Sequence, residues 1–322
     1  MSTYETSILV TGGTQGMGYH TTLALAQQCP SILIVIASRT DPDNAAISIN
    51  RKLGQSNVKF MPLDLSSLAK VRDCAKRWGA ENHPPIQALV LNAAIQLSGD
   101  IEYTDDGIEK HFAVNHVGHA LLFHLLVPSL THDARIVVVS SGVHDVVLKW
   151  GLTPAYTTPE EVARPSPEAV KKSGGRDRYA TSKVANVLWT LALGRHLSSH
   201  PVHKDKTVVA LDPGLMFPTR LTRDASWLLQ FLSNNVAYHL IPLLRVLINS
   251  NINGPAESGG NLAWLAVGKE VHGLKGVYFE KRREHAVSEQ AQSQKLQEGL
   301  WRWTVERVAG GEEERERFAR VE

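Results

Sequence analysis

The chain has 322 residues, 43% of them hydrophobic, and a formal net charge of +2. Its length exceeds the usual size of one domain, although a single α/β sheet with its helices can reach it, and its apolar content is ample for a large core. The small net charge and the lack of a long block of Lys and Arg argue against a nucleic-acid surface.

Apolar runs and helical segments alternate along the chain. Strands are predicted at Ser7–Val10, Ile32–Ala37, Val58–Leu63, Ala88–Leu91, Arg135–Ser140, Lys206–Leu211 and Gly276–Phe279. Helices are predicted at residues 18–28, 44–53, 68–78, 106–126 and 178–197. Continuous apolar strands separated by helices indicate a parallel sheet that is covered on both faces. We therefore predict one α/β domain over residues 1–290, with a doubly wound parallel sheet of about seven strands.

A glycine-rich turn follows the first predicted strand. Residues 11–18 read Thr-Gly-Gly-Thr-Gln-Gly-Met-Gly and lead into the first predicted helix. Glycines let the backbone approach phosphate groups, and a helix N-terminus supplies N–H donors and the positive end of a dipole. By itself, this pattern fits an ordinary turn as well as a nucleotide loop. As a pyrophosphate-binding loop it contains Gly12, Thr14, Gln15, Gly16, Met17 and Gly18.

A tyrosine and a lysine lie four residues apart far down the chain. In the predicted helix at residues 178–197, this spacing places Tyr179 and Lys183 on one face. A free phenol, with a pKa near ~10, is a poor base at neutral pH, but a neighbouring ammonium favours the phenolate. The pair is therefore suited to proton transfer. Alone it also fits an amphipathic surface helix. Together with the glycine turn, it indicates a nucleotide cofactor beside a proton-transfer pair.

These two motifs and their order resemble the short-chain dehydrogenase/reductase family over roughly residues 5–285. The family's glycine motif, Thr-Gly-x-x-x-Gly-x-Gly, is matched in full by Thr11, Gly12, Gly16 and Gly18. The resemblance implies a Rossmann-type fold and a catalytic set of Asn115, Ser141, Tyr179 and Lys183. Ser141 would orient the carbonyl oxygen, and Asn115 would hold a water that connects Lys183 to solvent. Ser140 is disfavoured because strand alternation turns it toward the opposite face.

The end of the second predicted strand selects the cofactor. An acidic residue there would bind the ribose 2′-hydroxyl of NAD, whereas an arginine accommodates a 2′-phosphate. This chain has Ser38 at that point and Arg39 next to it, and a guanidinium can hold a phosphate through two hydrogen bonds. A solvated loop arginine is the alternative. We predict NADP(H).

The resemblance implies further cofactor contacts at Asp64, Leu65, Asn92, Pro213, Gly214 and Thr219. Asp64 would hydrogen-bond the adenine, although it or Ser66 would also suit the N-cap of the next helix. Asn92 lies where the family has Asn-Asn-Ala-Gly. Leu91 replaces the first Asn of that motif and Ile95 replaces its Gly.

Neither metal binding nor secretion is indicated. Four histidines lie on the predicted helix at residues 106–126, namely His111, His116, His119 and His124. No third ligand type clusters with them, so we expect packed or surface imidazoles and no metal site. Cys29 and Cys74 lack metal-ligand spacing and suit free thiols in a reducing compartment. Residues 1–6 lack a secretory pattern, which predicts a cytoplasmic protein.

Two regions are longer than a minimal enzyme of this fold requires. Residues 142–178 precede Tyr179, and such a loop is normally a substrate-pocket wall, a lid or a partly disordered insertion. Residues 215–255 are strongly apolar yet contain Asn, His and Arg, so they are no clean membrane span. We predict a lid over an apolar substrate, with a subunit interface or a peripheral membrane contact as alternatives. Residues 291–322 are predicted to form a C-terminal helical tail, in which the charged run 312–317 is solvated.

Within the family, the long loop before Tyr179 and residues 115–119 and 276–279 resemble the retinol-dehydrogenase-like and protochlorophyllide-reductase-like group, and also reductases of fungal secondary metabolism. We predict NADPH-dependent reduction of a ketone or aldehyde on a bulky apolar small molecule, such as a secondary-metabolite intermediate, with Tyr179 as proton donor. Two alternatives stay open. One is an enoyl reductase, and the other is a cofactor-binding relative that catalyses a non-redox cyclisation or acts as a sensor.

Overall fold

The computed structural model describes residues 4–148, 151–216, 241, 243, 245 and 250–322. Its central sheet has eight strands in the order β10-β9-β6-β5-β4-β1-β2-β3. They are β1 (Ser7–Thr11), β2 (Leu33–Ser38), β3 (Val58–Pro62), β4 (Ile86–Leu91), β5 (Leu130–Val139), β6 (Thr207–Asp212), β9 (Lys275–Glu280) and β10 (Arg283–Glu284). The strands pair in parallel except β10, which is antiparallel to β9. The prediction of about seven strands missed β10, because Arg283 and Glu284 form no apolar run.

The strand order reverses beside β1. This strand pairs with β2 on one side, where Val10 faces Ile36, and with β4 on the other, where Val10 faces Val90. All five residues of β1 are buried, which explains its continuous apolar run. Ligands of open α/β sheets bind at the carboxyl ends of the strands at such a switch point.

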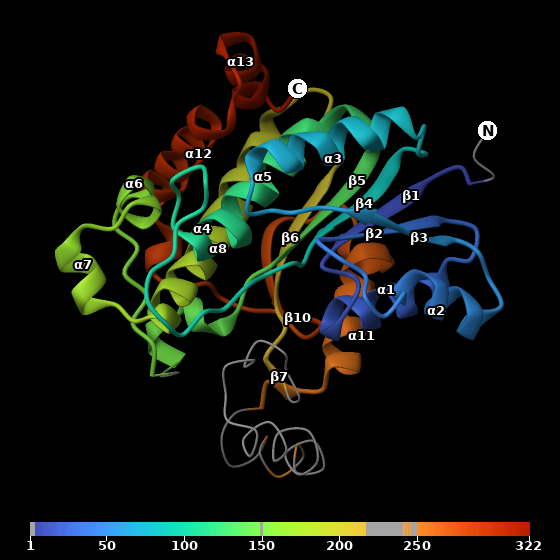
Figure 1. Cartoon of the computed structure of the whole chain (residues 1–322), viewed down its shortest axis with the longest axis horizontal. Coiled ribbons are helices and arrows are strands. Elements are labelled where there is room, and N and C mark those ends of the chain that lie inside the picture. The colour runs from blue at the N-terminus through green and yellow to red at the C-terminus, as the bar shows by residue number, and fades with distance from the viewer. Residues whose placement is uncertain (1–3, 149–150, 217–240, 242, 244, 246–249) are drawn as a thin grey trace.

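Helices cover both faces of the sheet (Figure 1). One face carries α1 (Gly16–Gln28), α2 (Ala45–Leu53) and α11 (Pro255–Val267). The other carries α3 (Leu68–Ala80), α5 (Gly118–Leu126) and α8 (Gly175–Ser199). Strand alternation sends Leu9 into the hydrophobic cluster on one face and Val10 into the cluster on the other. The predicted doubly wound α/β fold is therefore confirmed.

The helix predicted at residues 106–126 begins four residues later and is interrupted. It consists of α4 (Lys110–Phe112), a π-helical turn (Ala113–Val117) and α5. Glu109 caps it, because its carboxylate accepts a hydrogen bond from Phe112 N (2.8 Å). Asp106 instead accepts one from Leu68 N (3.0 Å), at the start of α3. Single π-helical turns occur often at functional sites, and Asn115 lies at the centre of this one.

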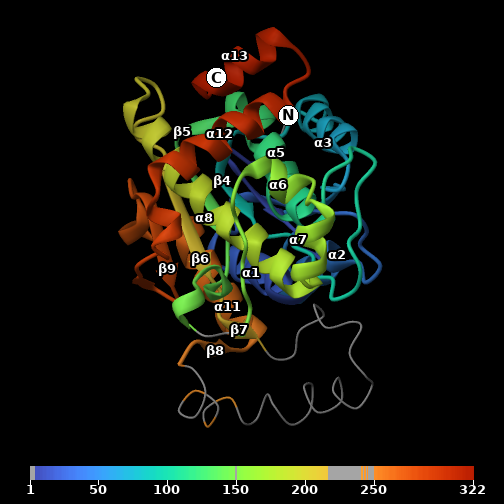
Figure 2. The same ribbon diagram turned by 90° about the vertical axis from the view of Figure 1, so that its left-hand side faces the viewer.

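Residues 142–178 include two short helices beside α8, α6 (Pro159–Ala163) and α7 (Pro167–Lys172) (Figure 2). Hydrogen bonds join this region to the C-terminal part of the chain, and two of them involve Tyr156 and Glu160. Gln290 Nε2 donates to Tyr156 O (2.7 Å), and Trp303 Nε1 donates to Glu160 Oε2 (2.9 Å). Short 3-10 turns lie at Val127–Ser129, Gly142–His144, Val146–Leu148, Lys269–Val271 and Gln290–Gln292.

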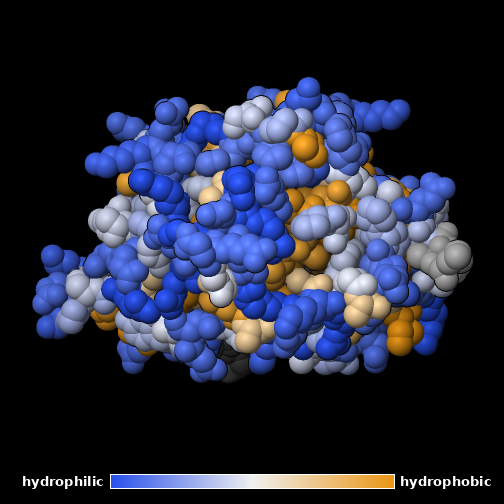
Figure 3. All heavy atoms as spheres, turned by 90° about the horizontal axis from the view of Figure 1, so that it is seen from above, coloured by the Kyte–Doolittle hydropathy of each residue, from blue (hydrophilic) through white to orange (hydrophobic). Residues whose placement is uncertain are grey.

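The C-terminal helices pack into the core, although most of the charged run 312–317 is exposed as predicted. They are α12 (Gln294–Val308) and α13 (Glu312–Arg320). The hydroxyl of Thr304 lies 3.0 Å from His116 Nε2, and the ring of Phe318 stacks on His124 at 4.7 Å. Their buried apolar residues are Leu300, Trp301, Val305, Val308 and Phe318. Seen from the side where these helices lie, the surface is mostly hydrophilic, with apolar side chains visible in a recess (Figure 3).

The lid that we predict over residues 215–255 lies largely outside the described residues. The structure does not describe residues 217–240, 242, 244 and 246–249. At its two ends, β7 (Leu215–Met216) and β8 (Ile252–Asn253) form a separate parallel pair. Among the described helices, none combines the length and the apolarity that a bilayer crossing needs.

Candidate active site

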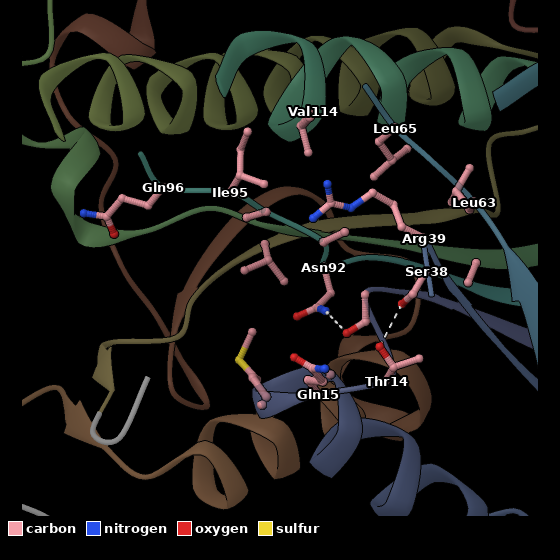
Figure 4. Close-up of a pocket in the computed structure, with 18 of the residues that line it drawn as sticks. Thr14, Gln15, Ser38, Arg39, Leu63, Leu65, Asn92, Ile95, Gln96 and Val114 are labelled. Atoms are coloured by element: carbon pink, nitrogen blue, oxygen red, sulfur yellow. Dashed lines mark hydrogen bonds between the residues drawn. The ribbon is translucent and has the colours of Figure 1, made fainter. Parts of the chain in front are cut away.

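A cavity of about 660 Å³ opens at the carboxyl edge of the sheet, where the strand order reverses (Figure 4). It contains most of the predicted site, namely Gly12, Thr14, Gln15, Gly16, Met17, Gly18, Arg39, Asp64, Leu65, Asn92, Tyr179, Lys183 and Pro213. Asn115, Ser141 and Gly214 are not among the residues that line it, and Thr219 lies outside the described residues. The cavity therefore joins the predicted phosphate loop to the predicted proton-transfer pair.

The glycine turn has the backbone geometry of a phosphate cradle. Gly12 and Gly16 have φ angles of +68° and +55°, a region that residues with a side chain rarely adopt. A Cβ atom on Gly18 would lie 2.1 Å from Gly12 O, so only glycine fits there. The first turn of α1 has no side-chain cap and no acidic residue, which leaves its N–H groups and positive dipole end to an anion. These residues fit the pyrophosphate of a dinucleotide.

Asn92 fastens the end of β4 to this turn. Its Nδ2 donates to Thr11 O (2.7 Å), and its backbone N–H donates to Thr11 Oγ1 (2.9 Å). The backbones approach so closely that a Cβ atom on Gly12 would lie 2.9 Å from Ala93 Cα. Asn92 thus keeps the glycine turn in place. Its predicted approach to the ribose stays a prediction.

Arg39 follows the carboxyl end of β2 and lines the cavity with Ser38 and Thr14. The Thr14 hydroxyl donates a hydrogen bond to Ser38 Oγ (3.3 Å), as Figure 4 shows. The guanidinium of Arg39 is exposed and makes neither a hydrogen bond nor an ion pair with any described residue. It is therefore available to an anionic ligand in the cavity.

Asp64 lines the cavity and is already hydrogen-bonded. Its carboxylate accepts from Ser66 Oγ (2.6 Å) and from Lys70 Nζ (3.0 Å). Burial raises the pKa of Asp64, but the hydrogen bonds from Ser66 and Lys70 outweigh this effect and leave the pKa below its usual value. The N-cap of α3 is Ser67, not Asp64 or Ser66. The adenine contact of Asp64 stays a prediction.

Tyr179 and Lys183 lie one turn apart on α8, and both are buried. Lys183 Nζ donates to Val139 O (3.0 Å) and lies 5.5 Å from the centre of the Tyr179 ring. Burial lowers the pKa of Lys183 to about 7, against the opposing effect of the Asp212 carboxylate. Burial, with a further contribution from Asp212, raises the pKa of Tyr179. Burial therefore opposes the phenolate that Lys183 is expected to favour, and the effect of Lys183 on Tyr179 stays a prediction. A raised pKa keeps the phenol protonated, as a proton donor must be.

Two serines follow β5 and differ in their contacts. Ser140 lines the cavity, against the alternation argument, but its hydroxyl is buried and donates to Lys183 O (2.9 Å). Ser141 is half-buried and caps the next 3-10 turn through a long hydrogen bond from Val143 N (3.5 Å). Ser140 therefore fixes α8, whereas the Ser141 hydroxyl is weakly engaged. The catalytic role of Ser141 stays a prediction.

Asn115 joins two walls of the site from the π-helical turn. Its Oδ1 accepts from Ile95 N (2.9 Å), and its Nδ2 donates to Ile95 O (3.1 Å) and to Ser182 Oγ (2.9 Å). Both ends of the amide are thus occupied by the loop after β4 and by α8. The close packing of this helix explains Gly118 as well, since a Cβ atom there would lie 2.4 Å from Leu65 O. The water-holding role of Asn115 stays a prediction.

A buried network that the sequence reasoning missed holds the loop after β4. His111 Nε2 accepts from Leu97 N (2.8 Å), and His111 Nδ1 lies 2.6 Å from Glu109 Oε1. Arg178 donates to Gly99 O (2.9 Å), and its Nε lies 3.7 Å from Glu109 Oε1. Leu97 lines the cavity, so the network fixes one of its walls. Arg178, a charged residue directly before Tyr179, was the one indication of this network in the sequence.

The four helical histidines are packed imidazoles, as predicted. His111, His116, His119 and His124 are all buried. Burial lowers the pKa of His116 and of His124 to about 3 and that of His119 to about 4. No three His, Cys, Asp or Glu side chains converge as metal ligands in the part of the chain that the structure describes.

A phosphate cradle and a buried tyrosine–lysine pair thus share one cavity. A family described as short chain dehydrogenase matches residues 6–158. Polyprenol dehydrogenase of Mus musculus is 31% identical over 301 residues, which cover 91% of this chain and 81% of that protein. The chain belongs to the short-chain dehydrogenase/reductase family. This family consists of oxidoreductases that bind a nicotinamide cofactor.

Two other similar proteins were found, one by sequence and one by structure. Retinol dehydrogenase 13 of Mus musculus is 30% identical over 306 residues, covering 92% of this chain and 81% of that protein. A solved structure from Mycobacterium Paratuberculosis superposes with a TM-score of 0.67 at 22% identity and covers 95% of this chain and 94% of that one. The relatives confirm the likeness to the retinol-dehydrogenase-like group of short-chain dehydrogenase/reductases, and the solved structure confirms the fold.

Proposed function

We propose that this short-chain dehydrogenase/reductase is a cytoplasmic enzyme that uses NADPH to reduce the ketone or aldehyde group of a bulky apolar small molecule. The observation that carries the proposal is the single cavity with the glycine turn at one end and Tyr179 at the other. The nicotinamide supplies a hydride when bound. The chain's own residues bind and orient both molecules, and Tyr179 donates its proton to the developing alkoxide.

The choice of NADPH rests on Arg39. Its guanidinium lies at the end of β2, where the adenosine ribose of a bound dinucleotide is placed, and Ser38 supplies no carboxylate to bind a 2′-hydroxyl. A 2′-phosphate would gain a charge-assisted hydrogen bond from this exposed cation. NADPH therefore suits the site better than NADH.

The choice of an apolar substrate rests on the remaining cavity wall. Its apolar side chains include Ile95, Leu97, Val114 and Met216, beside the polar Gln96 and Lys110. The names of the relatives, polyprenol dehydrogenase and retinol dehydrogenase, point to apolar substrates too. Residues 215–255 would extend this wall as a lid, because their many large side chains favour burial by roughly 1.5–3 kcal/mol each.

The test is to incubate the protein with NADPH and bulky ketones, aldehydes and enones, including retinal, and to identify the products. Formation of alcohols supports the proposal. Saturation of the enone instead identifies an enoyl reductase. NADPH binding without any redox product identifies a non-redox relative. A Tyr179→Phe variant serves as the inactive control, and Tyr103→Phe, at an exposed site, controls for loss of a phenol.

The lid is tested by placing a charge in it. Trp227→Asp or Phe231→Asp should raise KM for a bulky substrate several-fold and leave NADPH affinity unchanged. Val202→Asp, at an exposed apolar position that does not line the cavity, is the matched control. If the lid variants keep their KM but lose dimerisation or liposome association, the segment is a subunit interface or a membrane contact.

A further inference from the structure

Asp212 ends β6 and is 3% exposed, yet the proposed reaction gives it no role. One carboxylate oxygen accepts from Gly214 N (2.9 Å), and the other accepts from Asn251 Nδ2 (3.0 Å). The backbone N–H of Gly142 also donates to it. A carboxylate is stable in the interior only when hydrogen-bond donors surround it, and here three donors do.

The three donors belong to three separate segments of the site. Gly142 follows Ser141, at the end of β5. Gly214 follows Pro213, which lines the cavity, and its φ of +78° lets the chain turn sharply there. Asn251 precedes β8. One side chain thus ties together the two turns that follow β5 and β6 and the two ends of the apolar segment.

Neighbouring contacts strengthen both turns. His144 Nδ1 lies 2.9 Å from Ser141 O, and His144 Nε2 accepts from Ser288 N (3.2 Å). The carbonyl of Ser141 and the N–H of the residue after it are therefore both held by buried side chains. On the other turn, Asn253 Nδ2 donates to Pro213 O (3.0 Å) and to Asn251 Oδ1 (2.8 Å). The network continues without a break from the serine turn to β8.

We propose that Asp212 is a positioning residue that fixes the Ser141–Gly142 turn against the Pro213–Gly214 turn, and so sets the place of the serine hydroxyl relative to the cavity. Its consequence for catalysis rests on the proposed function, whereas its structural role does not. The carboxylate also acts through its charge on the catalytic pair. The ionisable groups that face it are Tyr179 and Lys183 on α8, His144 after β5, and Tyr278 and Glu280 on β9.

The structural role is tested by hydrogen exchange on the full chain. Asp212→Ala leaves the N–H groups of Gly142 and Gly214 without their acceptor, so peptides over residues 140–145 and 213–216 should exchange at least about tenfold faster. Peptides over β1 and β4 should not change. Asp205→Asn, at an exposed site, is the matched control. Unchanged exchange in both target peptides would overturn the proposal, whether or not the enzyme reduces a carbonyl.

The catalytic role is tested by removing the carboxylate from residue 212 and then placing one at residue 251 instead. Asp212→Asn keeps the shape but turns an N–H₂ group toward that of Asn251, and kcat should fall roughly ten- to hundredfold while KM for NADPH stays the same. The loss of negative charge also lowers the pKa of Lys183, so the pH above which kcat declines should move down by about one unit. The double variant Asp212→Asn/Asn251→Asp restores a donor–acceptor pair and a carboxylate, and should recover most of kcat.

These outcomes separate the inference from the proposed function. If the wild-type protein reduces no carbonyl, the proposed function fails, and the exchange data alone decide the role of Asp212. If the protein is a reductase but Asp212→Asn keeps the wild-type kcat and pH profile, or the double variant gives no recovery, the positioning role is overturned.

Discussion

At its phosphate end the cavity presents backbone, whereas at its catalytic end it presents buried side chains. The first is made of a few consecutive residues, with Gly12 and Gly16 in the left-handed region and Gly18 against a carbonyl oxygen. The second combines Tyr179 and Lys183 with residues after β4, β5 and β6. A phosphate cradle needs only a local turn and a helix N-terminus, while proton transfer needs a dry site that distant segments must close.

The comparison is tested most severely by Tyr179→Phe. This change removes the transferable proton at one end and touches nothing at the other. We expect kcat to fall roughly 10³- to 10⁴-fold, while the Kd for NADPH stays within about twofold. Turnover assays and fluorescence titration measure the two quantities. A variant that retains most of its activity would show that another group donates the proton.

Lys183→Met should separate stability from activity at the catalytic end. The native pKa of Lys183 is about 7 and its ordinary value is 10.5, so the unfolded chain binds more protons between these pH values. The buried charge therefore destabilises the fold fully below pH 7, and the penalty disappears as the pH approaches 10.5. Val139 O keeps a hydrogen bond from Asn186 Nδ2 (3.1 Å) after the change.

We expect Lys183→Met to abolish turnover and to raise the free energy of unfolding at pH 6 by a few kcal/mol, with a gain that shrinks at higher pH. Urea unfolding at several pH values measures it. Lys172→Met, at an exposed site, is the control and should change little. A gain that is the same at pH 6 and pH 10 would contradict the assignment of this titration to Lys183.

Gly18→Ala should damage the phosphate end alone. The added Cβ atom would lie 2.1 Å from Gly12 O and must displace the turn. We expect the Kd for NADPH to rise about hundredfold, with kcat at saturating cofactor much less affected. Gly260→Ala, in α11 with open space around its Cβ position, should leave Kd unchanged and stabilise slightly. If the two variants bind NADPH equally well, the cradle is not where the phosphates bind.

Arg39→Ala should have the smallest effect of this series, on cofactor choice. Loss of one charge-assisted contact costs about 1.5–3 kcal/mol, which is roughly ten- to hundredfold in the preference for NADPH over NADH. Titration with both cofactors measures it. Arg51→Ala, at an exposed position of α2, is the matched control. An unchanged preference would refute the assignment of Arg39.

The contrast between a local turn and a site built from distant segments also explains how much of the structure could be predicted from the sequence. The strands near the switch point were predicted to within two residues, because parallel strands buried on both faces appear as unbroken apolar runs. The glycine turn and the Tyr179–Lys183 pair were found because their spacing is local. β10 was missed because an edge strand of two charged residues has no apolar pattern.

Contacts between distant residues were beyond such reasoning. Nothing near Leu97 in the sequence predicts that its N–H donates to His111, and nothing near His144 predicts a bond from Ser288, 144 positions later. The burial of Tyr179 and Lys183, which raises the pKa of the first and lowers the pKa of the second, is likewise a property of the folded site. The packing of α12 was accessible in principle, since Leu300, Trp301, Val305 and Val308 recur at helical spacing.

Because α12 and α13 complete the core, the core can close only after these last two helices have been synthesised. Thr304 meets His116 across 188 positions, and Phe318 covers His124, so the outer side of the helix that carries Asn115 is completed by residues made long after it. A nascent chain that has reached α8 still exposes this apolar side. Closure between such distant segments slows folding and leaves surface open to aggregation or to chaperones. We therefore expect chains that end before residue 294 to aggregate or to bind chaperones more readily than the full chain.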